Sequence, residues 1–80
     1  MPESGLREAV RSVWEDAFGI TIGGDPDFFE IGGDSVTALS ISAGLEKKFK
    51  VRPEIWILFD NPQLSQYVQV YSEILVEDGR

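Results

Sequence analysis

Apolar residues recur at the 3.6-residue period of an α-helix along most of this chain, and only a fold built from helices can bury them together. The first such series spans residues 6–18, so we predict a helix there. Ser4 is placed to cap its start and Gly19 to end it in a left-handed conformation. The series consists of Leu6, Ala9, Val10, Val13, Trp14, Ala17 and Phe18.

A second helix is predicted from Ser35 to about Phe49, capped either by Asp34 or by Ser35 itself. On a helical wheel one side is apolar and predicted to be buried, and it carries Ala38, Ile41, Ser42, Leu45 and Phe49. The other side carries Val36, Ser40, Ala43 and Lys47, with Leu39 at the border.

Two more helical segments follow. Pro53 is expected to open a short helical turn that carries Ile55, Trp56, Leu58 and Phe59. Trp56 is expected to pack at least partly in the core, as are Trp14 and the two tyrosines. After the turn Asp60-Asn61-Pro62, a last helix is predicted from the spacing of Leu64, Tyr67, Val68, Tyr71, Ile74 and Leu75, and residues 76–80 form a frayed polar end.

These elements predict an all-α fold. It is a small four-helix bundle, with three main helices plus a short third helix, and a long first loop over residues 20–34 pinned to the core by Phe28, Phe29 and Ile31. Eighty residues are enough for one small domain, so we expect a single domain over residues 1–80 with its core at about 6–75.

The composition excludes several kinds of chemistry. The chain has no cysteine and no histidine, which removes disulfides, zinc sites of the Cys/His type and the common nucleophile–base pairs, and no metal site is predicted. Its net charge of −7 argues against nucleic-acid binding. No apolar run is long enough to span a membrane, and the N-terminus lacks the apolar stretch of a signal peptide, so a cytoplasmic protein is expected.

The first loop contains the tetrapeptide Ile-Gly-Gly-Asp twice, followed once by Pro26 and once by Ser35. The first copy is interpreted as a turn only, because Asp-Pro initiates turns. The second copy places Ser35 at a helix start, where N–H groups and the helix dipole favour an anion such as a phosphate ester. A calcium loop starting at Asp25 fails because Val36 stands where a bidentate Glu is required, and no Gly-Lys-Ser/Thr completes a nucleotide loop.

The segment "DFFEIGGDSVTALSISAGLEKKF" resembles the thiolation site of the phosphopantetheine-dependent carrier protein family. The family pattern is an aromatic pair, a Gly-Gly-Asp-Ser element and a helix with leucine-type residues at fixed offsets, and "LFDNPQLSQYV" is similar to the entry of its last helix. The Gly-Gly form of the element before Asp34 and Ser35 favours the peptidyl carrier type.

The segment Phe49-Lys50-Val51 departs from the family's usual Phe-Gly-Val, so the second helix must end without a glycine.

The resemblance implies a non-catalytic carrier whose Ser35 holds a covalent 4′-phosphopantetheine, transferred from coenzyme A by a phosphopantetheinyl transferase. The arm's thiol would carry aminoacyl, peptidyl or acyl thioesters in nonribosomal peptide or hybrid natural-product biosynthesis, and a chain without cysteine needs such a thiol. The partners implied are an adenylation or acyl-loading enzyme and downstream condensation or tailoring enzymes, with no nucleic acid and no membrane, and the carrier is expected to be a monomer.

The resemblance also assigns contact residues. Gly33, Asp34 and Val36 would be recognised together with the cofactor and its transferase, and an exposed face of the second helix would bind partners weakly, with rapid release. That face consists of Val36, Leu39, Ser40, Ala43 and Lys47. Two alternatives stay open: an acyl carrier of polyketide or fatty-acid assembly, and an unmodified helical adaptor in which Ser35 is only a cap.

Overall fold

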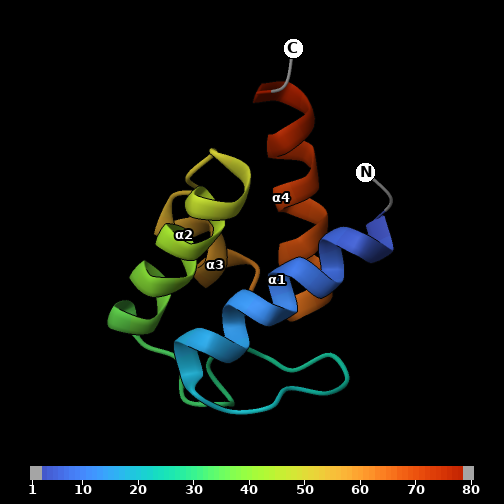
Figure 1. Ribbon diagram of the computed structural model, residues 1–80. Coiled ribbons are helices and arrows are strands. Elements are labelled where there is room, and N and C mark those ends of the chain that lie inside the picture. Colours follow the sequence, from blue (N-terminus) through green and yellow to red (C-terminus); the bar gives the residue numbers. More distant parts are fainter. Residues whose placement is uncertain (1–2, 79–80) are drawn as a thin grey trace.

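The structure, a computed structural model, describes residues 3–78, and within them the chain forms four helices (Figure 1). The elements are α1 (Glu3–Phe18), α2 (Ser35–Phe49), the short α3 (Ile55–Asp60) and α4 (Leu64–Asp78). The long first loop between α1 and α2 passes under one end of the bundle (Figure 1). The described residues form no strand, only an isolated bridge between Asp27 and Gln63. The all-α prediction is confirmed.

The core lies where the apolar stripes of the helices meet. Trp14 is fully buried and packs edge-on against Phe28 of the first loop, with ring centroids 5.9 Å apart. It also packs in a tilted arrangement against Tyr67 of α4, with ring centroids 6.1 Å apart. The predicted buried side of α2 is confirmed for Ala38, Ile41, Ser42 and Leu45, whereas Phe49 is half-buried. Among residues 3–78 no helix is both long enough and apolar enough to cross a membrane.

Helix α2 ends on a lysine in an unusual conformation. Lys50 has φ 67° and ψ 15°, in the left-handed region, and its N–H donates to the Glu46 carbonyl at 2.8 Å. It is the one non-glycine residue with positive φ within residues 3–78. Gly19 performs the same task after α1, with φ 71°. Helix α2 therefore ends in the left-handed conformation that glycine usually adopts, with a strained lysine in its place.

Lys50→Gly is expected to stabilise the fold. A side chain in the left-handed region costs about 1–2 kcal/mol, and the greater freedom of glycine in the unfolded chain offsets about half of that. The free energy of unfolding should rise by about 0.5–1 kcal/mol, which a thermal melt would register as about 4 °C in Tm. Lys50→Ala is the control, because it removes the charge but keeps the strain. An equal gain in both variants would contradict this explanation.

The first Ile-Gly-Gly-Asp copy does more than form a turn. Gly24 adopts φ 72°, as a turn requires, but the carboxylate of Asp25 then reaches the start of α4. It accepts hydrogen bonds from the Ser65 N–H at 2.6 Å and from the Ser65 hydroxyl at 2.7 Å. The Leu64 N–H donates to the Pro26 carbonyl at 3.0 Å, so the loop caps α4 from a distance. The interpretation of this copy as a turn alone was incomplete.

Several predicted positions differ in the structure. Helix α1 spans Glu3–Phe18 and so includes Ser4, which was expected to precede it. Pro53 precedes the N-cap Glu54 of α3 and lies outside that helix. Trp56 is 57% exposed, because α3 turns Ile57 and Leu58 toward the core instead.

The first loop and the C-terminal end also differ from expectation. Of the residues expected to pin the first loop, Phe28 is fully buried and Ile31 half-buried, but Phe29 is exposed. Helix α4 continues to Asp78, so residues 76–78 of the expected frayed end are helical, whereas residues 79–80 lie outside the described residues.

Candidate functional site: the serine that begins helix α2

Ser35 is the first residue of α2 and is exposed to solvent. The residue that caps the helix is Asp34, whose Oδ1 accepts a hydrogen bond from the Thr37 N–H at 2.9 Å and another from the Thr37 hydroxyl at 2.9 Å. Of the two caps considered from the sequence, the structure selects Asp34. The hydroxyl of Ser35 is therefore not needed to close the helix end.

The cap also explains the acidity of Asp34. The Thr37 N–H, and then the Thr37 hydroxyl, hold the pKa of this carboxyl below its ordinary value of 3.8. The stability that the cap contributes is therefore present above that ordinary value and is lost as the pH falls through the lowered pKa. Near neutral pH Asp34 is ionised and fully engaged with the helix start.

Two glycines before Asp34 have separate tasks. Gly32 adopts φ 97°, which a side chain would strain. Gly33 has an ordinary φ, but a Cβ there would meet the buried ring of Phe28 at 2.4 Å. The Gly33 N–H also donates to the Phe28 carbonyl at 2.9 Å. The second Ile-Gly-Gly-Asp copy thus packs against the buried Phe28 directly before the exposed serine.

The two copies share one function that the sequence did not reveal. The aspartate of each caps a helix start: Asp34 caps α2, which follows it directly, and Asp25 caps α4, which lies 39 positions further on. The positive-φ glycine is Gly24, the second of the pair, in the first copy and Gly32, the first of the pair, in the second. The same tetrapeptide therefore adopts two different backbone conformations.

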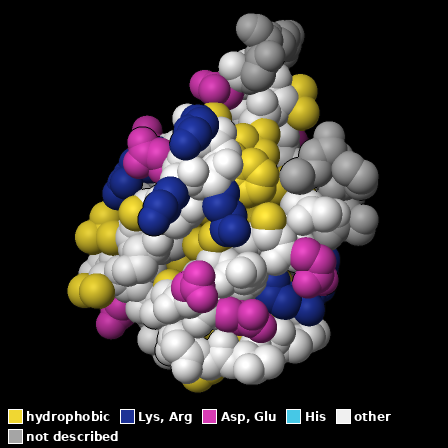
Figure 2. Space-filling model, viewed as in Figure 1, with side chains coloured by type: hydrophobic (Ala, Val, Ile, Leu, Met, Phe, Trp, Pro, Cys, Tyr) yellow, Lys and Arg dark blue, Asp and Glu magenta, His cyan; other side chains and the backbone are white. Residues whose placement is uncertain are grey.

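Exposed apolar side chains gather around the start of α2. Val36 is 71% exposed and Leu39 47% exposed, and both belong to the predicted contact face. Figure 2 shows apolar side chains at the surface near this end of α2, and Lys and Arg side chains over its C-terminal half. The other residues predicted for this face, Ser40, Ala43 and Lys47, are exposed as well.

A second exposed group of apolar side chains, which is aromatic, was not predicted from the sequence. Phe29 of the first loop stacks on Phe59 of α3, with ring centroids 5.8 Å apart and planes at 27°, and both rings are partly exposed. Trp56, also on α3, is exposed and its indole N–H donates to Glu54 at 2.7 Å. The helical period placed Trp56 and Phe59 on a short helix, but it could not show which of its residues would face solvent.

The site fits a phosphate-linked arm. A phosphodiester on Ser35 would lie at a helix N-terminus, where first-turn N–H groups and the dipole favour an anion, and the exposed hydroxyl leaves room for a long substituent. Residues 3–78 contain no group of three acidic side chains able to hold a metal ion. The acidic cap and the two glycines thus hold an exposed serine hydroxyl at a fixed helix start.

Comparison with known proteins shows the fold and then the family. The fold is similar to that of one solved structure: BlmI, a type-II acyl carrier protein from Streptomyces verticillus involved in bleomycin biosynthesis, superposes with a TM-score of 0.84 at 20% identity, covering 91% of this chain and 89% of BlmI. The family model "Phosphopantetheine attachment site" matches residues 8–70. The chain therefore belongs to the phosphopantetheine attachment site family and is a carrier of covalent 4′-phosphopantetheine.

Similar segments occur in large peptide synthetases. The chain is 38% identical to bacitracin synthase 3 of Bacillus licheniformis over 64 residues, and 33% identical to the nonribosomal peptide synthetase gloA of Glarea lozoyensis over 75 residues. These matches cover 79% and 90% of this chain but only 1% of each of those proteins. The relatives support the peptidyl type of carrier, and carrier domains of this family are in general non-catalytic.

Proposed function

We propose that Ser35 is the attachment residue for 4′-phosphopantetheine and that the protein carries aminoacyl or peptidyl thioesters in nonribosomal peptide assembly. One observation carries the assignment: Ser35 begins α2 with an exposed hydroxyl, while Asp34 makes the cap. The arm supplies the thiol that this cysteine-free chain lacks. The residues of the chain hold the arm at a fixed helix end and present it to other enzymes.

Partner binding is proposed for the contact face of α2. A phosphopantetheinyl transferase would recognise Gly33, Asp34 and Val36, and an adenylation or loading enzyme and later condensation or tailoring enzymes would contact Val36 and the exposed residues that follow it. Glu30, Asp34 and Asp60 are exposed on the first loop and α3, from which Phe29 and Phe59 also come, and the whole chain has a net charge of −7. A complementary partner surface would be apolar at its centre, basic opposite these carboxylates and acidic opposite Lys47.

The wider role follows from the same proposal. The protein acts as a monomer and is not itself an enzyme, residues 1–80 form a single carrier domain with its core at about 6–75, and the reactions take place in the cytoplasm. The role of a carrier that meets several enzymes in turn is supported by the contact face. Its few exposed apolar side chains suit weak and brief contacts.

Loading of the arm tests the peptidyl assignment. The modified protein would be offered a panel of amino acids with ATP and bacterial adenylation enzymes, and in parallel malonyl coenzyme A with an acyltransferase. We expect an aminoacyl adduct that hydroxylamine releases, since it is a thioester, and little malonyl adduct. Intact-protein mass spectrometry distinguishes the two. A malonyl adduct without any aminoacyl adduct would instead assign the chain to polyketide-type acyl carriers.

Val36→Asp is expected to lower kcat/KM for the transferase and for loading by about tenfold or more. A charge replaces an exposed apolar contact next to Ser35, and tenfold corresponds to about 1.4 kcal/mol of lost interaction. The matched control is Val76→Asp on α4, because Val76 is 67% exposed and Val36 71% exposed. Equal rates for both variants and the parent would show that the contact face does not include Val36.

A further inference from the structure

The two aspartates that cap helix starts hold their carboxylates in different ways. Asp25 uses both oxygens: Oδ1 accepts from the Ser65 N–H at 2.6 Å and Oδ2 from the Ser65 hydroxyl at 2.7 Å. Asp34 uses one oxygen, because its Oδ1 accepts from both the N–H and the hydroxyl of Thr37, each at 2.9 Å. Within residues 3–78 no hydrogen bond ends on Oδ2 of Asp34. The cap of α2 therefore leaves one carboxylate oxygen available to another molecule.

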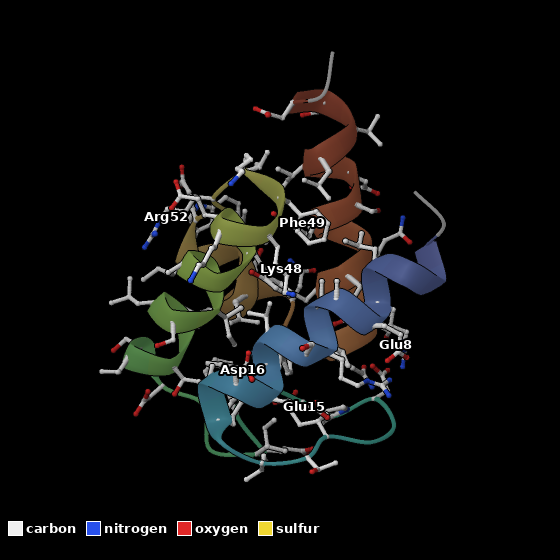
Figure 3. All side chains as sticks on the ribbon, in the orientation of Figure 1. Glu8, Glu15, Asp16, Lys48, Phe49 and Arg52 are labelled. Atoms are coloured by element: carbon white, nitrogen blue, oxygen red, sulfur yellow. The ribbon has the colours of Figure 1, made fainter. Side chains whose placement is uncertain are left out.

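The negative charge of Asp34 has no positive partner in the part of the chain that the structure describes. Asp34 is exposed and takes part in none of the salt bridges of residues 3–78. Figure 3 shows Lys48 and Arg52 at the C-terminal half of α2, away from its first turn, and Arg52 pairs there with Glu46 at 3.1 Å. A cation that pairs with Asp34 therefore comes from outside residues 3–78.

Thr37 restricts the orientation of the Asp34 carboxylate. An aspartate carboxylate turns readily about its Cβ–Cγ bond, because the minima of this torsion are broad. A single donor on Oδ1 would leave Oδ2 able to swing around that hydrogen bond. Two donors from one half-buried residue, one on the backbone and one on the side chain, limit this motion. A side chain that is already ordered loses less entropy when a partner binds it.

Resting on the proposed attachment of the arm to Ser35, we propose that Thr37 is a positioning residue for that modification. Its hydroxyl holds Oδ1 of Asp34 at the helix start, so that Oδ2 presents a negative charge in one orientation to a basic side chain of the transferase. Thr37 acts through Asp34 and takes no part in the chemistry. The hydroxyl two positions after the serine therefore affects how tightly the transferase binds the carrier, and not how fast the bound complex transfers the arm.

Steady-state kinetics with a phosphopantetheinyl transferase, saturating coenzyme A and varied carrier concentration test this inference. Thr37→Val keeps the branched shape of the side chain and removes the hydroxyl. Its KM should rise about two- to tenfold, as expected for ordering one side chain on binding, while kcat stays within about twofold of the parent. Thr37→Ser retains a hydroxyl and should restore KM. An unchanged KM in Thr37→Val, or a loss confined to kcat, would overturn the inference.

Asp34→Ala shows whether Thr37 acts through the carboxylate. In this background no carboxylate remains to be positioned, so the addition of Thr37→Val should raise KM no further. A further rise as large as that in the parent would mean that Thr37 contacts the transferase directly, against the inference. Circular dichroism would verify that every variant is folded at the assay temperature.

Two controls separate positioning from stability. Thr21→Val makes the same substitution at an exposed threonine of the first loop and should leave KM and kcat unchanged. Ser65→Ala removes the hydroxyl at the other cap, so it should lower the urea midpoint of unfolding and leave KM unchanged. Equal rises of KM in Ser65→Ala and Thr37→Val would reduce the effect to lost stability and overturn the inference. A parent that accepts no arm is a distinct result, because it overturns the assignment of Ser35 as well.

Discussion

Ser35→Ala is expected to lose attachment of the arm completely while folding as the parent does. Both cap hydrogen bonds at the start of α2 end on Asp34, so removing the serine hydroxyl leaves them intact. The free energy of unfolding should stay within about 0.5 kcal/mol of the parent, the range of a surface substitution away from special features. Urea denaturation measures the stability, and consumption of coenzyme A in the presence of a transferase measures the modification.

Asp34→Ala provides the complementary result. It removes the N-cap and should lower the urea midpoint of unfolding below those of the parent and of Ser35→Ala, while leaving the Ser35 hydroxyl in the chain. If Ser35→Ala were instead the more destabilising change, Ser35 would be a structural residue and the adaptor alternative would gain support.

Gly33→Ala is expected to destabilise the protein by about 2 kcal/mol, within the range for overpacking a filled core. The added Cβ would lie 2.4 Å from the ring of Phe28, which is fully buried and packs against Trp14 and Phe18, so the ring has no free space to move into. For a domain of this size the Tm should fall by about 10 °C. Because Gly33 stands two residues before Ser35, the modification rate should fall too.

Gly23→Ala is the matched control for that prediction, since it changes the corresponding glycine of the first Ile-Gly-Gly-Asp copy. Gly23 has no positive φ, and a Cβ there would meet nothing within 4 Å. We expect its Tm to stay at or slightly above that of the parent, because alanine reduces the freedom of the unfolded chain. Equal losses in the two variants would mean that Gly33 is needed for backbone conformation and not for its contact with Phe28.

The sequence predicted the parts of the fold that depend on periodicity. The buried side of α2 and the apolar stripe of α4 follow from residues spaced three and four apart, which share one helix face wherever the helix lies. Trp56 could not be placed in this way. Helix α3 has only six residues, and its rotation is set by Ile57 and Leu58, which pack against the core.

Parts of the candidate site could likewise be predicted from the sequence, and other parts could not. Ser35 and the exposed positions Val36 and Ser40 could be predicted, because they depend on a local motif and a helix face. The capping of α4 by Asp25 could not, since it joins residues 40 apart whose proximity only the folded chain creates. The stacking of Phe29 on Phe59 could not be predicted for the same reason.

The most direct test of the central claim is the intact mass of the protein after incubation with coenzyme A, magnesium and a broad-specificity phosphopantetheinyl transferase. Ser35→Ala and Ser40→Ala would be treated alongside, the latter as an exposed serine on the same helix. We predict one added phosphopantetheine on the parent and on Ser40→Ala, and none on Ser35→Ala. An unchanged mass of the folded parent, or an arm that still attaches to Ser35→Ala, would contradict the assignment.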